Sequence, residues 1–155
     1  MFGMNSVAFE QSITVLTIEN ASADTGYLGE IFKGISDAGV NLDMISQTAP
    51  TGRNVTLSFS MDDEDLQKAL KVIGVARETQ PEIACEVSSD NMKVVFYDKG
   101  MPEKCGIAGQ IFEIFNRAGV PVKLVTTSSD TVSVLFDRYH EAELRAEIER
   151  SVEIR

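Results

Sequence analysis

Apolar and polar residues alternate along several short stretches of the chain. Residues 13–18 combine apolar residues with threonine and are rich in β-branched side chains, and residues 55–60 alternate strictly between apolar and hydroxyl side chains. A period of two places successive side chains on opposite faces, which is typical of a half-buried strand. The same signs predict further strands at 42–48, 83–87, 93–97, 122–127 and 131–136.

Other stretches have the spacing of amphipathic helices. Leu28, Ile31, Phe32 and Ile35 form an i, i+3, i+4, i+7 stripe, and Gly39 is placed to end that helix. The acidic run at 62–65 precedes a second stripe, where its charges would favour the positive end of a helix dipole, so we interpret it as a cap rather than a metal site. Two more helices are predicted at 107–118 and 139–150.

The elements come in two similar sets, because residues 25–40 recur as residues 105–120 at a constant offset of 106 − 26 = 80. This period is too long for a solenoid repeat and indicates a duplicated small domain. Each copy has the order strand, helix, strand, strand, helix, strand. The sequence therefore predicts an α/β chain, more narrowly α+β, of two ferredoxin-like βαββαβ domains with antiparallel sheets and helices on one face. Phe32 and Phe112, which match in the repeat, are expected in the cores.

The composition narrows the classes of partner and the cellular location that we expect. The chain has 155 residues and a net charge of −10, with 14 basic against 24 acidic residues, which disfavours nucleic acids and anionic membrane surfaces as partners. It has no apolar run of 18 residues and no export signal at its start, so we expect a cytoplasmic protein with Cys85 and Cys105 as free thiols. Domains of about 70 residues with open sheet edges are marginal alone, so we also expect a homodimer.

The sequence offers no candidate residues for catalysis. His140 is the only histidine, and its polar surroundings suit a surface position at a helix start better than a general base. No serine or cysteine nucleophile has a partner at a recognisable spacing, and neither metal-ligand spacing nor a phosphate loop occurs. We expect no catalytic residue, no metal and no cofactor.

An amino-acid site is the better hypothesis from the residues. Gly26 and its neighbours Tyr27 and Leu28 open a helix, whose free N–H groups favour a carboxylate. Asp43 could balance an ammonium group, and Gln47 would lie on the same side of the following strand. The alternatives are a solvated Asp43 and, for Gly26 as for its counterpart Gly106, a turn glycine with positive φ.

A family resemblance covers about residues 7–150. The string Gly-Val-Asn-Leu-Asp-Met-Ile-Ser-Gln at 39–47, followed by the strand at 55–59 and an acid-capped helix, resembles the first regulatory ACT domain of bacterial aspartokinases. The Thr-Thr-Ser-Ser-Asp-Thr-Val-Ser-Val-Leu segment at 126–135 resembles the second ACT domain. The resemblance implies ACT domains at 11–84 and 85–155, and residues 7–9 could add a strand to the second.

The resemblance implies a regulatory function without catalysis in this chain. Such domain pairs bind lysine or threonine as effectors and give feedback control of aspartate-family amino-acid biosynthesis through aspartate kinase. Nothing here resembles the kinase domain's Lys-Phe-Gly-Gly motif. The chain would then be a regulatory region, a small subunit that partners a kinase domain or large subunit, or a stand-alone sensor of another amino-acid enzyme.

The resemblance also implies the effector site. The family places effectors where the first domain of one chain meets the second domain of another. In this sequence the implied residues are Thr25, Gly26, Tyr27, Leu28, Asn41, Asp43 and Gln47 of the first copy, and Val120, Pro121, Val122 and Lys123 of the second.

Two departures from the family pattern favour an alternative. The loop before the first helix lacks the family's proline, so it is less preorganised. Lys123 replaces the acid of the first copy, so the second copy is expected to lack a site of its own. The alternative is a dimerisation or interaction module that binds no ligand.

Overall fold

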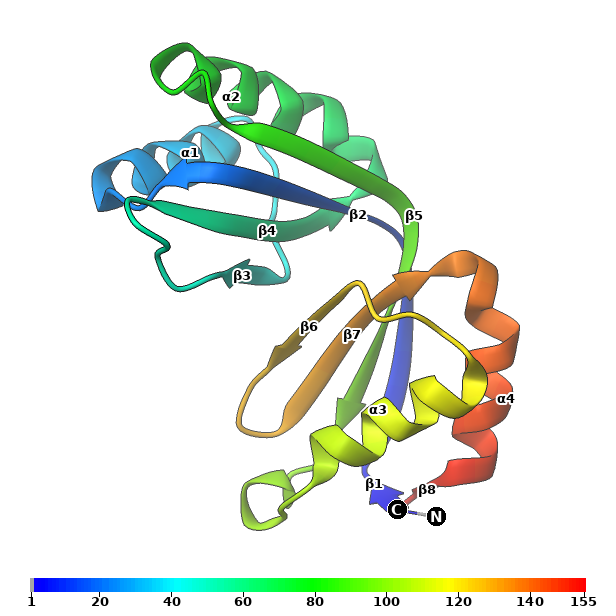
Figure 1. Ribbon diagram of the computed structural model, residues 1–155. Coiled ribbons are helices and arrows are strands. Elements are labelled where there is room, and N and C mark those ends of the chain that lie inside the picture. Colours follow the sequence, from blue (N-terminus) through cyan, green and yellow to red (C-terminus); the bar gives the residue numbers. More distant parts are fainter. Residues whose placement is uncertain (1) are drawn as a thin grey trace. The chain divides into compact units, whose positions relative to one another are not determined.

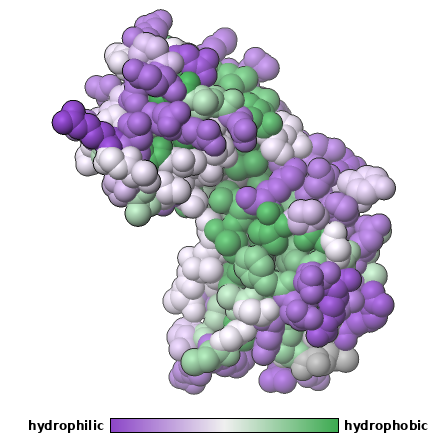
Figure 2. Space-filling model, in the orientation of Figure 1, coloured by the Kyte–Doolittle hydropathy of each residue, from purple (hydrophilic) through white to green (hydrophobic). Residues whose placement is uncertain are grey.

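The computed structural model describes residues 2–155, which divide by their contacts into two compact units (Figure 1). Unit 1 contains the N-terminal residues up to Gln11 together with Asp90–Arg155, and unit 2 contains Ser12–Ser89. Two long strands, β2 (Ser6–Ser22) and β5 (Ala84–Tyr97), supply residues to both units. Figure 2 shows hydrophilic residues over much of the visible surface of each unit, interrupted by hydrophobic ones.

Unit 2 is an antiparallel sheet covered by two helices. Its strand order is β3 (Ile45–Gln47), β4 (Asn54–Asp62), β2, β5, and β4 pairs antiparallel with both β2 and β3. The helices are α1 (Thr25–Asp37) and α2 (Leu66–Thr79), the latter preceded by the 3₁₀ turn η1 (Asp63–Asp65). Both helices contribute to one core with alternate residues of β4, so they cover the same face of the sheet. Buried members of this core include Leu16, Ile18, Leu28, Ile31, Ile35, Leu57, Phe59, Ala69 and Ile73.

Unit 1 repeats this plan with strands from distant parts of the chain. Its strand order is β2, β5, β7 (Thr131–Asp137), β6 (Leu124–Thr127), and β7 is antiparallel to β5 and β6. Its α-helices are α3 (Ile107–Ala118) and α4 (Glu141–Ser151), each preceded by a short 3₁₀ helix, η2 (Met101–Glu103) and η3 (Arg138–His140). A separate parallel pair joins the ends of the chain, β1 (Phe2–Met4) with β8 (Val152–Ile154). The core includes Met4, Val94, Phe96, Ile111, Phe115, Val134, Phe136 and Leu144.

The structure confirms the predicted α+β class with antiparallel sheets, and all four predicted helices are present. The helix predicted at 107–118 has the observed limits of α3. The strand predicted at 42–48 is shorter in the structure. Only Ile45–Gln47 forms a strand, and its three residues pair with β4. The strand predicted at 13–18 is part of the much longer β2.

One core prediction is wrong. Phe32 is half-buried and its ring centroid lies 6.3 Å from that of Phe59. Phe112, its counterpart in the repeat, is 45% exposed at the margin of α3, and the adjacent Phe115 fills the core instead. The stripe of α3 is broad enough that spacing alone did not separate its core from its margin.

Candidate functional site

The start of α1 holds the first group of predicted site residues. Thr25 and Gly26 are exposed, Tyr27 is half-buried and Leu28 belongs to the core. The carboxylate of Asp24 caps the helix by accepting a hydrogen bond from the Tyr27 backbone N–H (2.9 Å). A negative charge therefore already occupies the positive end of α1, and one of the N–H groups expected to bind a ligand carboxylate is engaged.

The two repeated glycines differ in conformation. Gly106 has φ of 86° and caps α3, as a turn glycine would. Gly26 lies inside the first turn of α1 and is not among the residues with positive φ. The turn-glycine interpretation is correct for Gly106 and wrong for Gly26.

The second group lies after α1 and along the sheet edge. Asn41 and Asp43 are exposed in the segment before β3, where the Asp43 backbone N–H donates to the Ser60 carbonyl (3.1 Å). Gln47 is exposed on β3 opposite Leu57. Alternation along the chain puts Asp43 and Gln47 on the same side, with their Cα atoms about 13 Å apart for an extended backbone.

Helix α1 separates the two groups in part. Its 13 residues span about 20 Å, so Thr25 and Asn41 lie toward opposite ends of it. A single amino acid has its carboxylate and ammonium only a few ångströms apart. Asp43 and the first turn of α1 in one unit therefore do not converge on one such pair of groups.

The predicted residues of the second copy lie after α3. Val120 is buried in the core and Val122 packs against it, whereas Pro121 is exposed. The Lys123 ammonium donates to Asn91 Oδ1 (2.6 Å) and lies 3.4 Å from Asp137 Oδ2. Its charge is thus engaged within unit 1.

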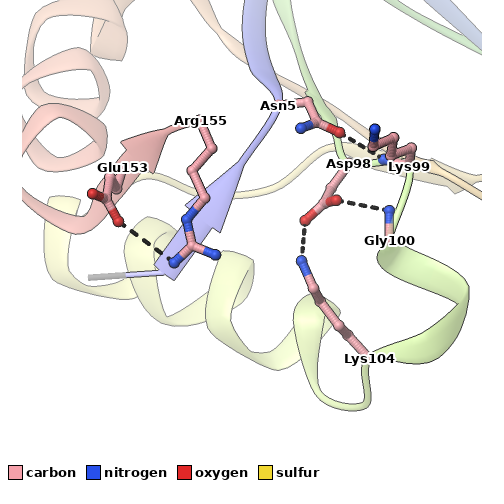
Figure 3. Close-up of polar contacts among 7 residues, drawn as sticks. All are labelled: Asn5, Asp98, Lys99, Gly100, Lys104, Glu153 and Arg155. Carbon is pink, nitrogen blue, oxygen red and sulfur yellow. Dashed lines mark hydrogen bonds and ion pairs between the residues drawn. The ribbon is translucent and has the colours of Figure 1, made fainter.

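The segment of unit 1 between β5 and α3, which corresponds to the connection between β2 and α1 in unit 2, is held by its own contacts (Figure 3). The Asp98 carboxylate accepts hydrogen bonds from the Gly100 backbone N–H (2.8 Å) and from the Lys104 ammonium. The Lys104 hydrogen bond, and then that from Gly100, hold the pKa of Asp98 below its usual range. The Lys99 backbone N–H donates to Asn5 Oδ1 (2.9 Å), which ties the loop to the N-terminal segment.

The corresponding region of unit 2 is open. A hollow of about 640 Å³ lies there, lined by Ser22, Asp24, Tyr27, Arg53, Asn54, Thr79, Gln80 and Glu82. Arg53 comes from the turn before β4 and Glu82 from the turn between α2 and β5. Sequence reasoning missed both, because residues from separate turns meet only in the fold. Burial, and then the charge of Glu82, raises the pKa of the Tyr27 hydroxyl.

The histidine and the two cysteines are not among the predicted site residues. His140 stacks edge-on against the exposed Tyr139 ring, with 5.2 Å between the ring centroids. Cys85 and Cys105 are free thiols, and burial raises the pKa of Cys85. Within residues 2–155, no three His, Cys, Asp or Glu side chains are placed to hold a metal ion. No α-helix in that range is both long and apolar enough to cross a membrane.

Comparison with known proteins begins with sequence. The family model of the ACT domain matches residues 14–78. The aspartokinase of Geobacillus stearothermophilus is 27% identical over 134 residues, which are 86% of this chain and 32% of that protein. The aspartokinase of Bacillus sp. strain MGA3 is 29% identical over 134 residues, with 86% and 33% coverage. The chain spans about a third of the length of these curated relatives.

Solved structures share the whole fold. The ligand-free regulatory subunit of aspartate kinase from Thermus thermophilus has a TM-score of 0.83 at 21% identity, over 97% of this chain and 99% of that one. Aspartate kinase from Synechocystis has a TM-score of 0.86 at 18% identity, over 97% and 27%. At these identities the solved structures establish the fold. Residues 14–78 are therefore an ACT domain, and the chain matches the regulatory region of aspartokinases over nearly its whole length.

Proposed function

We propose that this chain is the regulatory part of an aspartokinase and binds an aspartate-family amino acid, lysine or threonine, as a feedback effector. The observation that carries the proposal is the ACT match at 14–78 within a longer stretch similar to aspartokinases. The two regulatory domains are proposed at 11–84 and 85–155, the second with an added strand from 7–9. Phosphorylation of aspartate would take place elsewhere, on a kinase domain or a large subunit.

A kinase partner is supported by the size of the relatives. The curated aspartokinases are about three times as long as this chain. The chain also resembles a structure of aspartokinase alpha and beta subunits, with a TM-score of 0.81 over 96% of this chain and 97% of that one. Both a C-terminal region of a kinase and a separate subunit fit these lengths.

The effector site is proposed at the β3 edge, where Asp43 and Gln47 share one side. Asp43 would form an ion pair with the ammonium of the effector. Gln47 would hydrogen-bond to the effector further along the strand. Because Thr25 to Leu28 lie toward the other end of α1, this site is incomplete in a single unit 2. Residues Val120 to Lys123 of a second copy would complete it, with exposed Pro121 nearest to solvent.

A homodimer would bring two such surfaces together. Strand β3 lies at the end of the strand order of unit 2 and β6 at that of unit 1, so each is an edge strand. Ile45 on β3 is 50% exposed and Phe112 on α3 is 45% exposed. Pairing of edge strands between chains would satisfy their backbone groups and cover these apolar side chains.

Thermal unfolding of the purified chain with lysine, threonine and methionine tests the proposal. An effector at 100 times its Kd should stabilise the chain by about 2.7 kcal/mol. A shift caused by lysine or threonine should vanish in Asp43→Ala and persist in Glu78→Ala, a control that removes an exposed carboxylate from α2.

The second candidate function is a dimerisation module without a ligand. It is favoured by the Asp24 cap at the start of α1 and by the engagement of Lys123 within its own unit. If none of the three amino acids shifts the transition while the chain remains dimeric, this second candidate replaces the sensor.

A further inference from the structure

We propose that the open hollow of unit 2, together with the groove between α1 and α2, binds a small α-amino acid with an apolar side chain. This site goes beyond the effector site proposed above, because it requires neither Asp43 nor a second chain. It is built on Arg53, Glu82 and the apolar residues of the two helices.

Two opposite charges face this hollow without partners. The Arg53 guanidinium and the Glu82 carboxylate both line it, and neither has a hydrogen bond or ion pair with any described residue. Several other exposed arginines are paired with carboxylates, such as Arg145 with Glu141 at 2.8 Å. A ligand with both a carboxylate and an ammonium would satisfy the two groups together.

The arginine is the natural partner of the ligand's carboxylate. Its planar guanidinium can donate two parallel hydrogen bonds to a carboxylate. The start of α1 would be the competing anion site, but the Asp24 carboxylate already accepts a hydrogen bond from the Tyr27 backbone N–H there. The ammonium of the ligand would then turn to Glu82.

Hydrogen bonds hold the frame of the hollow. The Gln80 side chain accepts from the Ser22 backbone N–H (3.0 Å) and donates to the Asn20 carbonyl (2.5 Å), which ties the end of α2 to β2. The Ala23 backbone N–H donates to the Arg53 carbonyl (2.8 Å), which ties the turn before β4 to the residue that follows β2. The backbones that carry Arg53 and Glu82 are therefore positioned before a ligand arrives, which lowers the entropic cost of binding.

An apolar groove continues from the hollow. A space of about 200 Å³ lies between α1 and α2, and it shares Tyr27 and Thr79 with the hollow. Its other lining residues are Glu30, Ile31, Gly34, Val72, Val75 and Ala76.

The close approach of the two helices depends on Gly34. A Cβ there would lie 2.8 Å from Val72 Cγ1, so a larger residue would push the helices apart or displace the valine. Val75 leaves 64% of its surface exposed at the groove. Covering it with an aliphatic side chain is favourable because apolar surface is removed from water.

The residues that line the hollow and the groove indicate the class of ligand. The charged groups of the hollow fit the α-carboxylate and α-ammonium, and the valine, alanine and isoleucine side chains of the groove fit an aliphatic side chain. Leucine, isoleucine, valine and methionine meet both requirements. Among the described residues that line the groove, Glu30 is the only charged one.

Isothermal titration calorimetry of the full chain with L-leucine, L-isoleucine and L-methionine tests this inference, with L-alanine as the short-chain comparison. We expect binding that weakens about tenfold or more in Arg53→Gln and in Glu82→Gln, since each removes a charge-assisted contact. The matched controls Arg77→Gln and Glu78→Gln change exposed residues of α2 that do not line the hollow, and they should bind as the unaltered chain does. Val75→Asp should weaken leucine more than alanine.

The inference is overturned if none of the apolar amino acids binds, or if Arg53→Gln and Glu82→Gln leave their binding unchanged. Asp43→Ala separates it from the effector proposal. Leucine binding that persists in Asp43→Ala and weakens in Arg53→Gln supports the new site, whatever lysine and threonine do. Leucine binding that is lost in Asp43→Ala and kept in Arg53→Gln assigns all binding to the β3 edge and rejects it.

Discussion

Asp24 stabilises the start of α1 through its side chain, and the structure assigns it this role at the position where the family has a proline-containing loop. Its carboxylate accepts from the Tyr27 N–H at 2.9 Å. We predict that Asp24→Ala lowers the free energy of unfolding by about 1 kcal/mol, the usual value of a lost helix cap. Asp24→Asn keeps an oxygen acceptor and should recover most of it. Urea denaturation of the two variants checks this, and equal damage from both would show that charge rather than capping matters.

Asp98 gives unit 1 a pH-dependent contact. Its folded-state pKa is lowered, chiefly by the hydrogen bond from Lys104 and then by that from Gly100. The stability it contributes is therefore present above the unfolded-state pKa of about 3.9 and is lost as the pH falls through the lower folded-state pKa.

We predict that the unfolding midpoint of Asp98→Asn lies below that of the unaltered chain at pH 7, and that the two converge as the pH falls through the acid range. Urea midpoints measured from neutral to acid pH test this. Glu103→Gln, an exposed neighbour in η2, serves as the control and should follow the unaltered chain. A gap that stays constant with pH would contradict the role of the carboxylate charge.

Two phenylalanines of the amphipathic helix α3 differ in burial, because one lies in the core and the other at its margin. Phe115 is 2% exposed and its ring centroid lies 6.0 Å from that of Phe136, whereas Phe112 is 45% exposed. We predict that Phe115→Ala costs about 3–5 kcal/mol of unfolding free energy, the usual range for a buried phenylalanine. Phe112→Ala should cost much less in the monomer. Denaturant titrations of both variants at low concentration measure the difference, and similar losses would mean that Phe112 is covered in solution.

Helices and strands differ in how far the sequence predicts them. Helices were predicted well because their stripes and caps are local, as the limits of α3 show. The length of β2 was missed, since residues 6–12 have weak alternation and are held as a strand by pairing with distant β5. The same cause hid Arg53 and Glu82, which come from two turns 29 residues apart, whereas Asp43 and Gln47 were suggested by one short string.

The N-terminal segment has a structural role in the molecule as a whole. Residues up to Gln11 group with Asp90–Arg155, although some 80 residues separate them in the chain. Met4 is fully buried in the core of unit 1, and Phe9 packs edge-on against Phe136 at 6.4 Å. At the end of the chain the Arg155 backbone N–H donates to the Met4 carbonyl (2.9 Å). The two termini thus close the same unit.

Removal of this segment should therefore damage the unit that contains α3 and α4 and spare the other. We predict that deletion of residues 1–11 lowers the unfolding temperature of Asp90–Arg155, because β5 loses its neighbour and the core loses Met4. The Ser12–Ser89 unit keeps its own sheet and helices, so it should stay folded. Hydrogen exchange followed by NMR separates the two sets of amides. Phe9→Ala, a milder variant that also removes the contact with Arg145 (3.8 Å from the guanidinium carbon to the ring centroid), should act in the same direction. If the amides of α3 and α4 keep full protection in both variants, the N-terminal strand is dispensable and unit 1 folds on its C-terminal residues alone.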